Sequence, residues 1–502
     1  MTSTKRLLVN SFAGGFSQIL IIALRFISRT FLVKYIGVEV LGISGTLASL
    51  ISALSLAELG FQGAIVYRLY KPIGENDYER CNELLLIYKR IYSIIALIIA
   101  LLMLVLLPFL KFFLKGIEIN SFVYILYAIS GGNVVVSYLL AYKRSLLYVD
   151  QKDSIAKTVD CICNLLFISA GIVIVYFTRN YIYYMLIQVL QTIASNLIIH
   201  LFCKKLYKWQ AKAAVKKETV KDIFKDVKNI FANRIAIYVY TATDNLVISS
   251  FVGTIMVGFY SNYLMITSSL KGIVNSVLTQ VTPFIGRNYA LNSEKKDLEN
   301  YLMVYTFARF LIAGMVAIPL FILVPGFINW WLGPDYIMKN IGLLLCIEMY
   351  LDFVHSALCD YISVSGNFAY EKRISIVGAS CNIVSSIIFV KFFGVQGVLF
   401  GTILSQSVFW ILRTYTVLKK IFKSNKSFVF EYILKNIFYA LITVFAACIT
   451  YFITKNIHLN FYLFEFVLKG LLSVIIFTLC VFISFFKTKE FKFMVQKLLK
   501  RK

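Results

Sequence analysis

Long apolar runs recur along the chain and are separated by short polar segments. A helix needs about 20 mostly apolar residues to cross a bilayer. Prolines are expected only at or near the ends of such helices, where a helix tolerates them best, and this applies to Pro108, Pro319 and Pro325. The runs predict fourteen membrane-spanning helices, near residues 9–33, 40–67, 91–110, 121–142, 155–177, 181–203, 230–251, 256–284, 301–325, 340–365, 374–393, 395–418, 436–454 and 463–486.

Composition supports this interpretation. Hydrophobic residues make up 59% of the 502 residues and charged residues 15%, whereas soluble domains average about 25% charged residues. The mean hydropathy is +0.78. A soluble enzyme could not bury so much apolar surface, and 43 Phe, 32 Tyr and only 6 Pro exclude a disordered chain. The sequence therefore predicts an all-α polytopic membrane protein.

Basic residues predict how the helices cross the membrane. Most of the 51 Lys and Arg fall on the side of the N-terminus. The opposite side holds Lys34, Lys111, Lys115, Arg179, Lys339, Lys391 and Lys455. The positive-inside rule then places both termini in the cytoplasm. Arg25 and Arg29 interrupt the first apolar run and no small-residue cleavage site follows it, so the first helix is expected to remain in the mature chain.

The formal net charge of +26 raises the alternative of a nucleic-acid partner. The surplus is spread over short loops and the C-terminal tail, so we expect no nucleic-acid binding. The densest basic stretch is Lys204–Lys228, and within and just beyond it apolar residues recur at helical spacing: Val220, Ile223, Phe224, Val227 and Phe231. This spacing predicts a basic amphipathic helix on the inner leaflet.

Cysteine usage gives no sign of disulfide or metal chemistry. None of the nine Cys lies in a predicted external loop, so no disulfides are expected. Cys161 and Cys163 lack further His or Cys ligands at metal spacing. A role as small apolar residues within helices is the simpler interpretation.

The two halves of the chain resemble each other, which indicates an internal duplication. Gly37 and Gly42 are five residues apart and lie between two apolar runs. Gly253 and Gly258 have the same spacing and also lie between two apolar runs. Farther on, DSIAKTVDCICN (Asp153 to Asn164) parallels EKRISIVGASCN (Glu371 to Asn382). Six helices per copy preserve orientation, so the copies form a parallel repeat, an arrangement typical of transporters. We predict an N-lobe at 1–206, a basic linker at 207–229, a C-lobe at 230–420, and two extra helices with a basic tail at 421–502.

Ionisable residues inside apolar spans are costly unless they face a partner or a cavity, which makes them functional candidates. The basic candidates for a substrate cavity are Arg25, Arg29, Arg234, Lys271, Arg309 and Arg413. Arg29 and Arg413 could instead extend toward the membrane surface. Lys271 is harder to dismiss because it lies near the middle of the eighth span.

Acidic candidates serve ion coupling or structural pairing. Glu58 lies in the second span, where it could pair with Arg25, and Asp244 lies in the seventh. In the tenth span, Glu348, Asp352 and His355 follow i, i+4, i+7 and share one face. This face could bind a coupling cation or relay protons, or it could pack against a neighbouring helix. A second His at metal spacing is missing, so no metal site is predicted.

A cavity lined by several Arg and Lys suits a substrate with concentrated negative charge, because Arg binds phosphate through two donors and Lys acts as a point charge. A lipid pyrophosphate would fit. The abundant Tyr, Asn and Ser of the spans could hydrogen-bond to or stack against sugars, although aromatic residues also serve ordinary packing.

Several runs carry a family resemblance. RFISRTFLVKYIGVEVLGISGTLASLISALSLAELG (Arg25 to Gly60) and KPIGEND (Lys71 to Asp77) resemble Wzx-type polysaccharide flippases. VGFYSNYLMI (Val257 to Ile266) and VTPFIG (Val281 to Gly286) resemble the same family. These flippases belong to the multidrug/oligosaccharidyl-lipid/polysaccharide (MOP) exporter superfamily, and the resemblance covers most of the chain. It implies two six-helix lobes around a V-shaped, MATE-like cavity, with the last two helices outside the duplicated core.

The resemblance also implies a function. It implies translocation of undecaprenyl-pyrophosphate-linked oligosaccharide from the inner to the outer leaflet of a bacterial cytoplasmic membrane, for capsule, O-antigen or a similar polymer. No cofactor is implied, although coupling to an H⁺ or Na⁺ gradient is. The polysaccharide polymerase and the glycosyltransferases of the pathway would be protein partners. Lipid II flippases of the superfamily use arginines in helices one, two and eight. Here Arg25 or Arg29 and Lys271 match the first and eighth, but Glu58 in the second departs from that pattern.

Two rival functions compete with this one. A cation-coupled multidrug exporter of the same fold usually has an acidic cavity. The basic candidates for the cavity in this chain count against that function. A membrane polymerase or glycosyltransferase of the same pathway would usually display a large external loop, and the predicted external loops are short. A flippase, not an enzyme, is therefore the predicted function.

Overall fold

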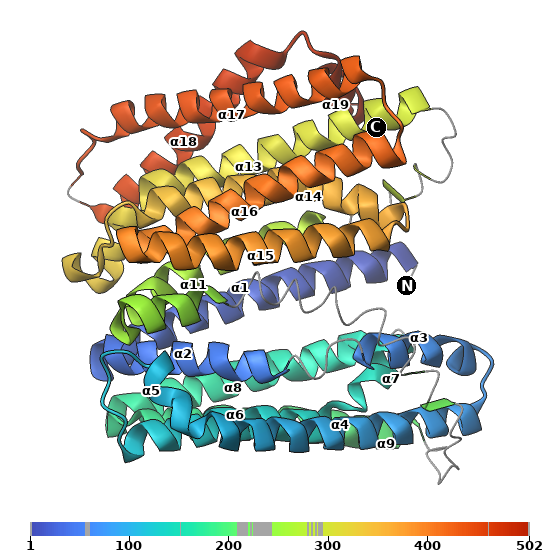
Figure 1. The fold of residues 1–502 in the computed structure, drawn as a ribbon, viewed down its shortest axis with the longest axis vertical. Helices are drawn as coiled ribbons and strands as arrows, with labels where there is room; N and C mark the ends of the chain where they lie inside the picture. The colour runs from blue at the N-terminus through green and yellow to red at the C-terminus, as the bar shows by residue number, and fades with distance from the viewer. Residues whose placement is uncertain are drawn as a thin grey trace. The chain divides into compact units, whose positions relative to one another are not determined.

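The computed structural model describes most of the chain. Of residues 3–17, 62–64, 277, 495 and 497–499 the backbone alone is described. The described residues are 3–55, 61–150, 152–207, 219–220, 223, 243–278, 281–282, 285–286, 289, 295–459 and 461–499. Throughout these residues the regular structure is helical (Figure 1).

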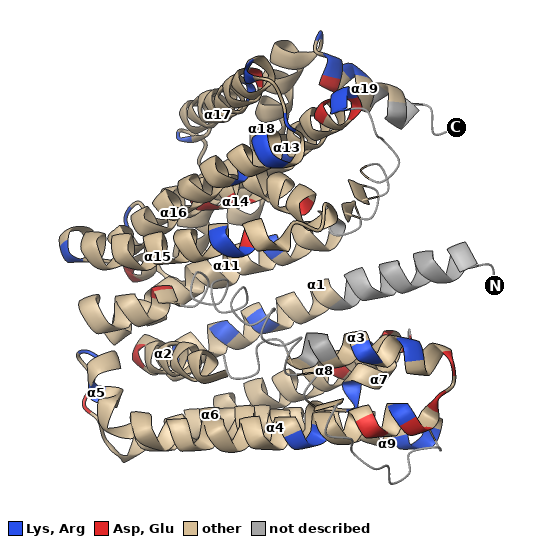
Figure 2. Cartoon of the chain, turned by 45° about the vertical axis from the view of Figure 1, so that its right-hand side comes forward, with Lys and Arg blue, Asp and Glu red and all other residues tan. Residues whose placement is uncertain are grey.

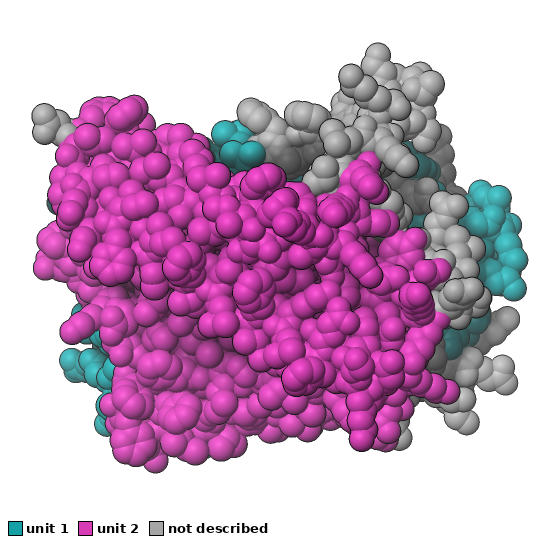
Figure 3. Space-filling model, turned by 90° about the horizontal axis from the view of Figure 1, so that it is seen from above, with its two compact units in different colours: residues 1–258 teal, residues 259–502 magenta. Residues whose placement is uncertain are grey.

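Packing divides the chain into two compact units, residues 1–258 and 259–502, which Figure 3 colours separately. The boundary falls within one helix, α11 (Thr254–Leu278). The four-part division into lobes, linker and extra helices stays a prediction. Each unit is described by itself below.

Unit 1 is a bundle of helices (Figure 1). In chain order these are α1 (Ser3–Tyr35), α2 (Val38–Leu54), α3 (Phe61–Gly74), α4 (Tyr78–Leu106), the 3₁₀ turn η2 (Leu107–Phe109), α5 (Leu110–Phe113), α6 (Ser121–Ala141), α7 (Arg144–Val149), α8 (Asp153–Thr178), α9 (Tyr181–Leu206), the π-helical turn η3 (Ile248–Val252) and the start of α11 (Thr254–Leu278).

Unit 2 continues α11 and adds a second bundle. Its helices are α13 (Lys295–Leu332), the 3₁₀ turn η4 (Pro334–Tyr336), α14 (Ile341–Val364), α15 (Phe368–Phe393), α16 (Val395–Tyr415), the π-helical turn η5 (Thr416–Ile421), α17 (Lys426–Thr454), α18 (Tyr462–Phe485) and α19 (Lys489–Leu499).

Ten helical segments of the described structure are long and apolar enough to cross a membrane. They match ten of the predicted spans: the third to the sixth and the ninth to the fourteenth. For example, the span predicted at 340–365 is the helix Ile341–Val364, and that at 181–203 is Tyr181–Leu206. The predicted seventh span lies mostly outside the described residues. The total of fourteen stays a prediction.

Two predictions about helix ends were wrong. The second span, predicted as one run over 40–67, ends at Leu54, and a separate helix begins at Phe61. Pro319 and Pro325 lie inside α13, which continues to Leu332. A proline removes one backbone hydrogen bond, and membrane helices tolerate this because neighbouring groups satisfy the freed carbonyl. Only Pro108, in the turn that follows α4, fits the expectation.

Each unit has its own apolar core. In unit 1, α7 packs between α4, α8 and α9, with Leu146 and Leu147 fully buried. In unit 2, Phe307 and Phe310 of α13 pack against Tyr439 of α17 and Phe477 of α18. The two extra helices therefore pack directly on α13. The charged residues of unit 1 gather at the end formed by the start of α4, α7 and the end of α9 (Figure 2).

The duplicated glycines form a close helix crossing within unit 1. A Cβ on Gly42 of α2 would lie 2.2 Å from the carbonyl oxygen of Thr254, at the start of α11. A Cβ on Gly258 would likewise lie 2.2 Å from the carbonyl oxygen of Val38. Gly42 therefore faces the residue four positions before Gly258, and Gly258 faces the residue four positions before Gly42. The contact is thus reciprocal, as around a two-fold axis. Such backbone contact requires small residues and is typical of membrane helix pairs.

The duplicated asparagines also occupy corresponding places. Asn164 of α8 accepts a hydrogen bond from Gln191 of α9 at 3.1 Å. Asn382 of α15 donates one to Thr402 of α16 at 3.1 Å. In each unit, therefore, the asparagine that ends the repeated motif bonds to the following helix, which supports the internal duplication.

The predicted basic linker touches protein at its described residues. Thr219 donates a hydrogen bond to Glu83 of α4 at 2.8 Å and accepts one from Arg80 at 2.8 Å. Ile223, predicted on the face toward the inner leaflet, is completely buried. Ile223 is therefore covered by protein and not by lipid, which corrects the prediction for this residue. Phe224, Val227 and Phe231 lie outside the described residues.

Candidate functional site

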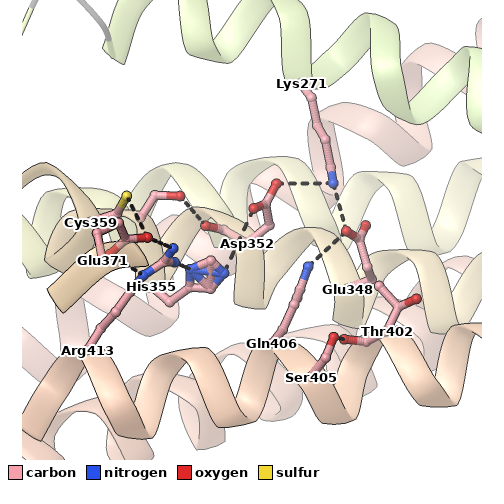
Figure 4. Close-up of polar contacts among 11 residues, drawn as sticks. Lys271, Glu348, Asp352, His355, Cys359, Glu371, Thr402, Ser405, Gln406 and Arg413 are labelled. Atoms are coloured by element: carbon pink, nitrogen blue, oxygen red, sulfur yellow. Dashed lines mark hydrogen bonds and ion pairs between the residues drawn. The ribbon is translucent and has the colours of Figure 1, made fainter. Parts of the chain in front are cut away.

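A charged cluster lies inside the membrane-spanning helices of unit 2 (Figure 4). Lys271 extends from α11, and its amine donates to Glu348 Oε1 at 2.8 Å and contacts Asp352 Oδ2 at 3.1 Å. Glu348 and Asp352 lie one turn apart on α14, so one ammonium group bridges both carboxylates. About a quarter of the Lys271 side chain is exposed.

His355, the third residue of the predicted i, i+4, i+7 set, lies on the same face of α14. His355 is 5% exposed, and its Nε2 lies 3.9 Å from Asp352 Oδ1. From α16, Gln406 donates to Glu348 Oε1 at 2.9 Å. The predicted stripe of Glu348, Asp352 and His355 therefore does point toward neighbouring helices, and it contacts α11 and α16.

Arg413, at the end of α16, extends the cluster to α15. Its guanidinium donates twice to Glu371, at 2.5 and 3.3 Å, and its Nη1 lies 3.1 Å from His355 Nδ1. Arg carries only donors, so His355 Nδ1 must accept. The neutral imidazole then has its proton on Nε2, which faces Asp352. Arg413 thus fixes the tautomer of His355.

The cluster carries unequal charge. It holds three carboxylates, Glu348, Asp352 and Glu371, whereas Lys271 and Arg413 are its two cations. With His355 neutral, the carboxylates of the cluster outnumber its cations by one. An uncompensated charge inside a membrane protein is expensive, so this arrangement favours uptake of a proton or a small cation. Among the described residues no group of three or more His, Cys, Asp and Glu has the geometry of a metal site.

Arg309 forms a separate buried pair one helix away. Its guanidinium donates to Asp360 and to the Tyr305 hydroxyl, and that hydroxyl donates to Asp360 at 2.6 Å. Arg309 is 4% exposed. The arrangement ties α13 to α14, and it leaves little of the guanidinium accessible to a ligand.

The candidate residues of unit 1 have contacts of their own. Arg25 is exposed and has no hydrogen bond or ion pair with another described residue, whereas Arg29 donates to the Gly258 carbonyl at 3.2 Å. Asp244 is half-buried, and its neighbour Asn245 donates to Ser49 of α2 at 3.0 Å. Glu58 and Arg234 lie outside the described residues. Of the residues singled out from the sequence, the structure brings five into one cluster: Lys271, Glu348, Asp352, His355 and Arg413.

The sequence did not point to two members of the cluster as site residues. Glu371 stood out only as part of the repeat, and Gln406 not at all. A charged residue near the start of α15 is typical of a solvated helix end, and a lone Gln in an apolar helix gives no signal of its partner. For Glu371, the one signal in the sequence was an acidic residue close to the start of an apolar run.

Ten helices of the described structure are long and apolar enough to cross a membrane, and an ionisable cluster lies between helices of unit 2, which defines a multi-pass membrane protein with an interior polar centre. Three solved structures have a similar fold. The lipid II flippase MurJ in an inward closed conformation has a TM-score of 0.68 and 16% identity, with 94% of this chain and 99% of that chain covered. An inward-facing multidrug resistance MATE family transporter of the MOP superfamily has a TM-score of 0.60 and 15% identity, over 79% and 96%.

A third structure is a MOP superfamily transporter from Pyrococcus furiosus, described as having a binding pocket of reversed polarity. It has a TM-score of 0.53 and 15% identity, over 81% of this chain and 93% of that chain. At these identities the likeness establishes the fold alone, which this chain shares with the three structures. Among curated protein sequences, none matches this chain.

The family follows from the sequence itself. A sequence profile described as "Polysaccharide biosynthesis protein" matches residues 7–289. The chain belongs to this family, which confirms the resemblance to Wzx-type flippases at family level. The predicted all-α, MATE-like fold class is also confirmed.

Proposed function

We propose that the protein flips undecaprenyl-pyrophosphate-linked oligosaccharide from the inner to the outer leaflet of a bacterial cytoplasmic membrane by alternating access. The observation that carries the proposal is Lys271, a part-exposed cation inside the spans of a chain from the polysaccharide biosynthesis family. The pyrophosphate would meet Lys271 and the predicted cations of the cavity, and the polyprenyl tail would stay in lipid.

Lys271 can exchange partners in this mechanism. In the structure it is shared between Glu348 and Asp352, and a pyrophosphate would compete with them for the same ammonium. Withdrawing Lys271 toward the substrate would leave two carboxylates one turn apart, which a proton or Na⁺ would then compensate. This coupling to an ion gradient is part of the proposal.

The proposal places the protein between two other steps. Glycosyltransferases on the cytoplasmic side must supply the finished lipid-linked unit, and a polymerase on the outer side must consume it.

Both termini would lie in the cytoplasm, as the positive-inside rule predicts. A cysteine introduced into the C-terminal tail should then react with membrane-impermeant maleimide only after the cells are opened.

The deciding experiment follows lipid-linked oligosaccharide in cells depleted of the protein. Finished units should accumulate on the cytoplasmic face. If finished units instead reach the outer face at the normal rate, the flippase proposal is wrong, and uptake of cationic dyes would then test a multidrug exporter.

Lys271→Ala is expected to lower flipping about tenfold or more, because it removes the point charge offered to the pyrophosphate. Arg25→Ala should also impair flipping, in line with its exposed, unpaired position among the described residues. Outer-leaflet oligosaccharide is measured at matched protein levels in the membrane. Lys391→Ala, at an exposed site near the end of α15, is the control and should be silent. Normal flux in both test variants would contradict their role.

Neutralising the acidic candidates should uncouple transport from the ion gradient. In Asp352→Asn combined with Asp244→Asn, flipping in proteoliposomes should lose its response to an imposed pH or Na⁺ gradient while slow downhill flipping continues. The reason is that the carboxylate charge drives cation uptake when Lys271 moves away. A response equal to that of the natural protein would remove both residues from the coupling mechanism.

A further inference from the structure

A second polar assembly lies within unit 1, in a region that the mechanism above does not use. Arg144 of α7 donates to both carboxylate oxygens of Asp160 on α8, at 2.7 and 2.8 Å. The same guanidinium donates to Ser195 at 2.6 Å and to Asn196 at 2.8 Å, both on α9. Ser195 in turn donates to Asp160 at 2.6 Å. Three helical elements thus meet around one guanidinium.

The assembly continues along α8 and α9 toward the middle of both helices. Asn164, one turn beyond Asp160, donates to the Asp160 carbonyl at 2.7 Å and accepts from Gln191 at 3.1 Å. We call these six residues the polar ladder: Arg144, Asp160, Asn164, Gln191, Ser195 and Asn196. Both α8 and α9 are long and apolar enough to span a membrane.

The ion pair of the polar ladder is accessible, whereas Ser195 and Asn196 are buried, and the ladder carries no net charge. The side chain of Arg144 is 30% exposed and that of Asp160 is 37% exposed. An ion pair facing lipid would be costly. This accessible pair lies close to the predicted cytoplasmic end of α8, where water can reach it. Because Asp160 neutralises Arg144, the surface offers little attraction to a phosphate and suits an uncharged ligand.

The ladder also keeps hydrogen-bonding capacity. Arg144 has five N–H donors, and the four bonds to Asp160, Ser195 and Asn196 leave one, on Nη1, beyond those used within the ladder. The Gln191 amide uses its nitrogen toward Asn164, and its oxygen can serve as an acceptor. A donor and acceptors fixed on neighbouring helices match the hydroxyls of a sugar.

The repeat provides an internal comparison. Asn382, the counterpart of Asn164 in unit 2, is completely buried, and its partner Thr402 is 5% exposed. Asn164 and Gln191 are both only part-buried. The same motif is therefore sealed in one copy and open in the other. Structural bonding alone requires no such opening.

We propose that the polar ladder binds sugar residues of the lipid-linked oligosaccharide, while the basic residues bind its pyrophosphate. This inference rests on the proposed function and adds a glycan contact on α8 and α9. With the predicted orientation, Asp160 lies about two turns from the cytoplasmic end of α8, where a substrate arriving from the inner leaflet would first be met.

Binding to full-length protein in nanodiscs tests this division of labour. The two probes are undecaprenyl pyrophosphate and the lipid-linked oligosaccharide extracted from cells depleted of the protein. The natural protein should bind the oligosaccharide-linked lipid about tenfold more tightly, as expected for one or two net hydrogen bonds. Gln191→Met and Asn164→Leu should abolish this preference without changing the affinity for undecaprenyl pyrophosphate.

Thr402→Val is the matched control, since it removes the corresponding bond in the sealed copy. It should keep the preference even if its melting temperature falls. Equal binding of the two probes by the natural protein, or a preference that survives in Gln191→Met and Asn164→Leu, would overturn the glycan contact while leaving the flippase standing. Failure of both probes to bind would overturn the flippase and the glycan contact together.

Discussion

Arg413→Met is expected to destabilise the protein by about 3–5 kcal/mol, the cost typical of breaking a buried ion pair by removing one partner. Glu371 would keep its charge with no guanidinium beside it, and the Arg413 and Glu371 side chains are only 9% and 10% exposed. His355 would also lose the donor that fixes its tautomer. The melting temperature in detergent should fall by about 10 °C or more.

A second substitution separates charge from packing. Adding Glu371→Gln to Arg413→Met removes the stranded charge, so part of the lost stability should return. The exposed pair Lys157–Asp153, whose side chains are 78% and 34% exposed, provides a surface comparison. Lys157→Met should cost less than about 1 kcal/mol. A melting temperature that is unchanged in Arg413→Met would show that Glu371 is solvated and not buried.

Gly42→Ala should produce the other large effect, because the added Cβ has no room. It would lie 2.2 Å from the Thr254 carbonyl oxygen and 3.1 Å from the Gly258 nitrogen, and neither backbone atom can turn aside as a side chain can. The two helices must separate, at a cost of about 3 kcal/mol, the upper part of the usual range for overpacking. We expect a lower melting temperature and less flipping.

Gly272→Ala is the control for Gly42→Ala. Gly272 lies in α11, and a Cβ there would meet nothing within 4 Å. Alanine also has the higher helix propensity, so this variant should be neutral or slightly more stable than the natural protein. Equal melting temperatures for Gly42→Ala and Gly272→Ala would mean that the crossing is looser than its geometry indicates.

Most helices could be predicted from the sequence because a membrane span has a simple pattern. A run of about 20 apolar residues is typical of a bilayer-crossing helix, and the runs at 340–365 and 374–393 became α14 and α15 with small shifts. The end of α2 at Leu54 was missed because apolar residues continue beyond it in the sequence. The prolines of α13 were misplaced because a local rule for soluble helices was applied where neighbouring helices can satisfy the backbone.

The candidate site was only half predictable. The i, i+4, i+7 spacing of Glu348, Asp352 and His355 is a property of one helix and can be read from the sequence. The partners on α11, α15 and α16 depend on which helices pack together. The spacing of residues along one helix does not carry this information. Lys271 was therefore predicted only as a basic residue of the substrate cavity, and its pairing with two carboxylates came from the structure. Arg144 was overlooked because it follows a span instead of interrupting one.

The glycine crossing also has the symmetry of an interface between two identical subunits. A symmetric dimer uses the same surface patch on both subunits. If residue i of one subunit contacts residue j of the other, then residue j of the first subunit contacts residue i of the second. Gly42 facing Thr254 and Gly258 facing Val38 have this reciprocal form, although all four residues now belong to one polypeptide. The crossing therefore has the form of an isologous contact between two copies of one glycine motif, held within a single polypeptide.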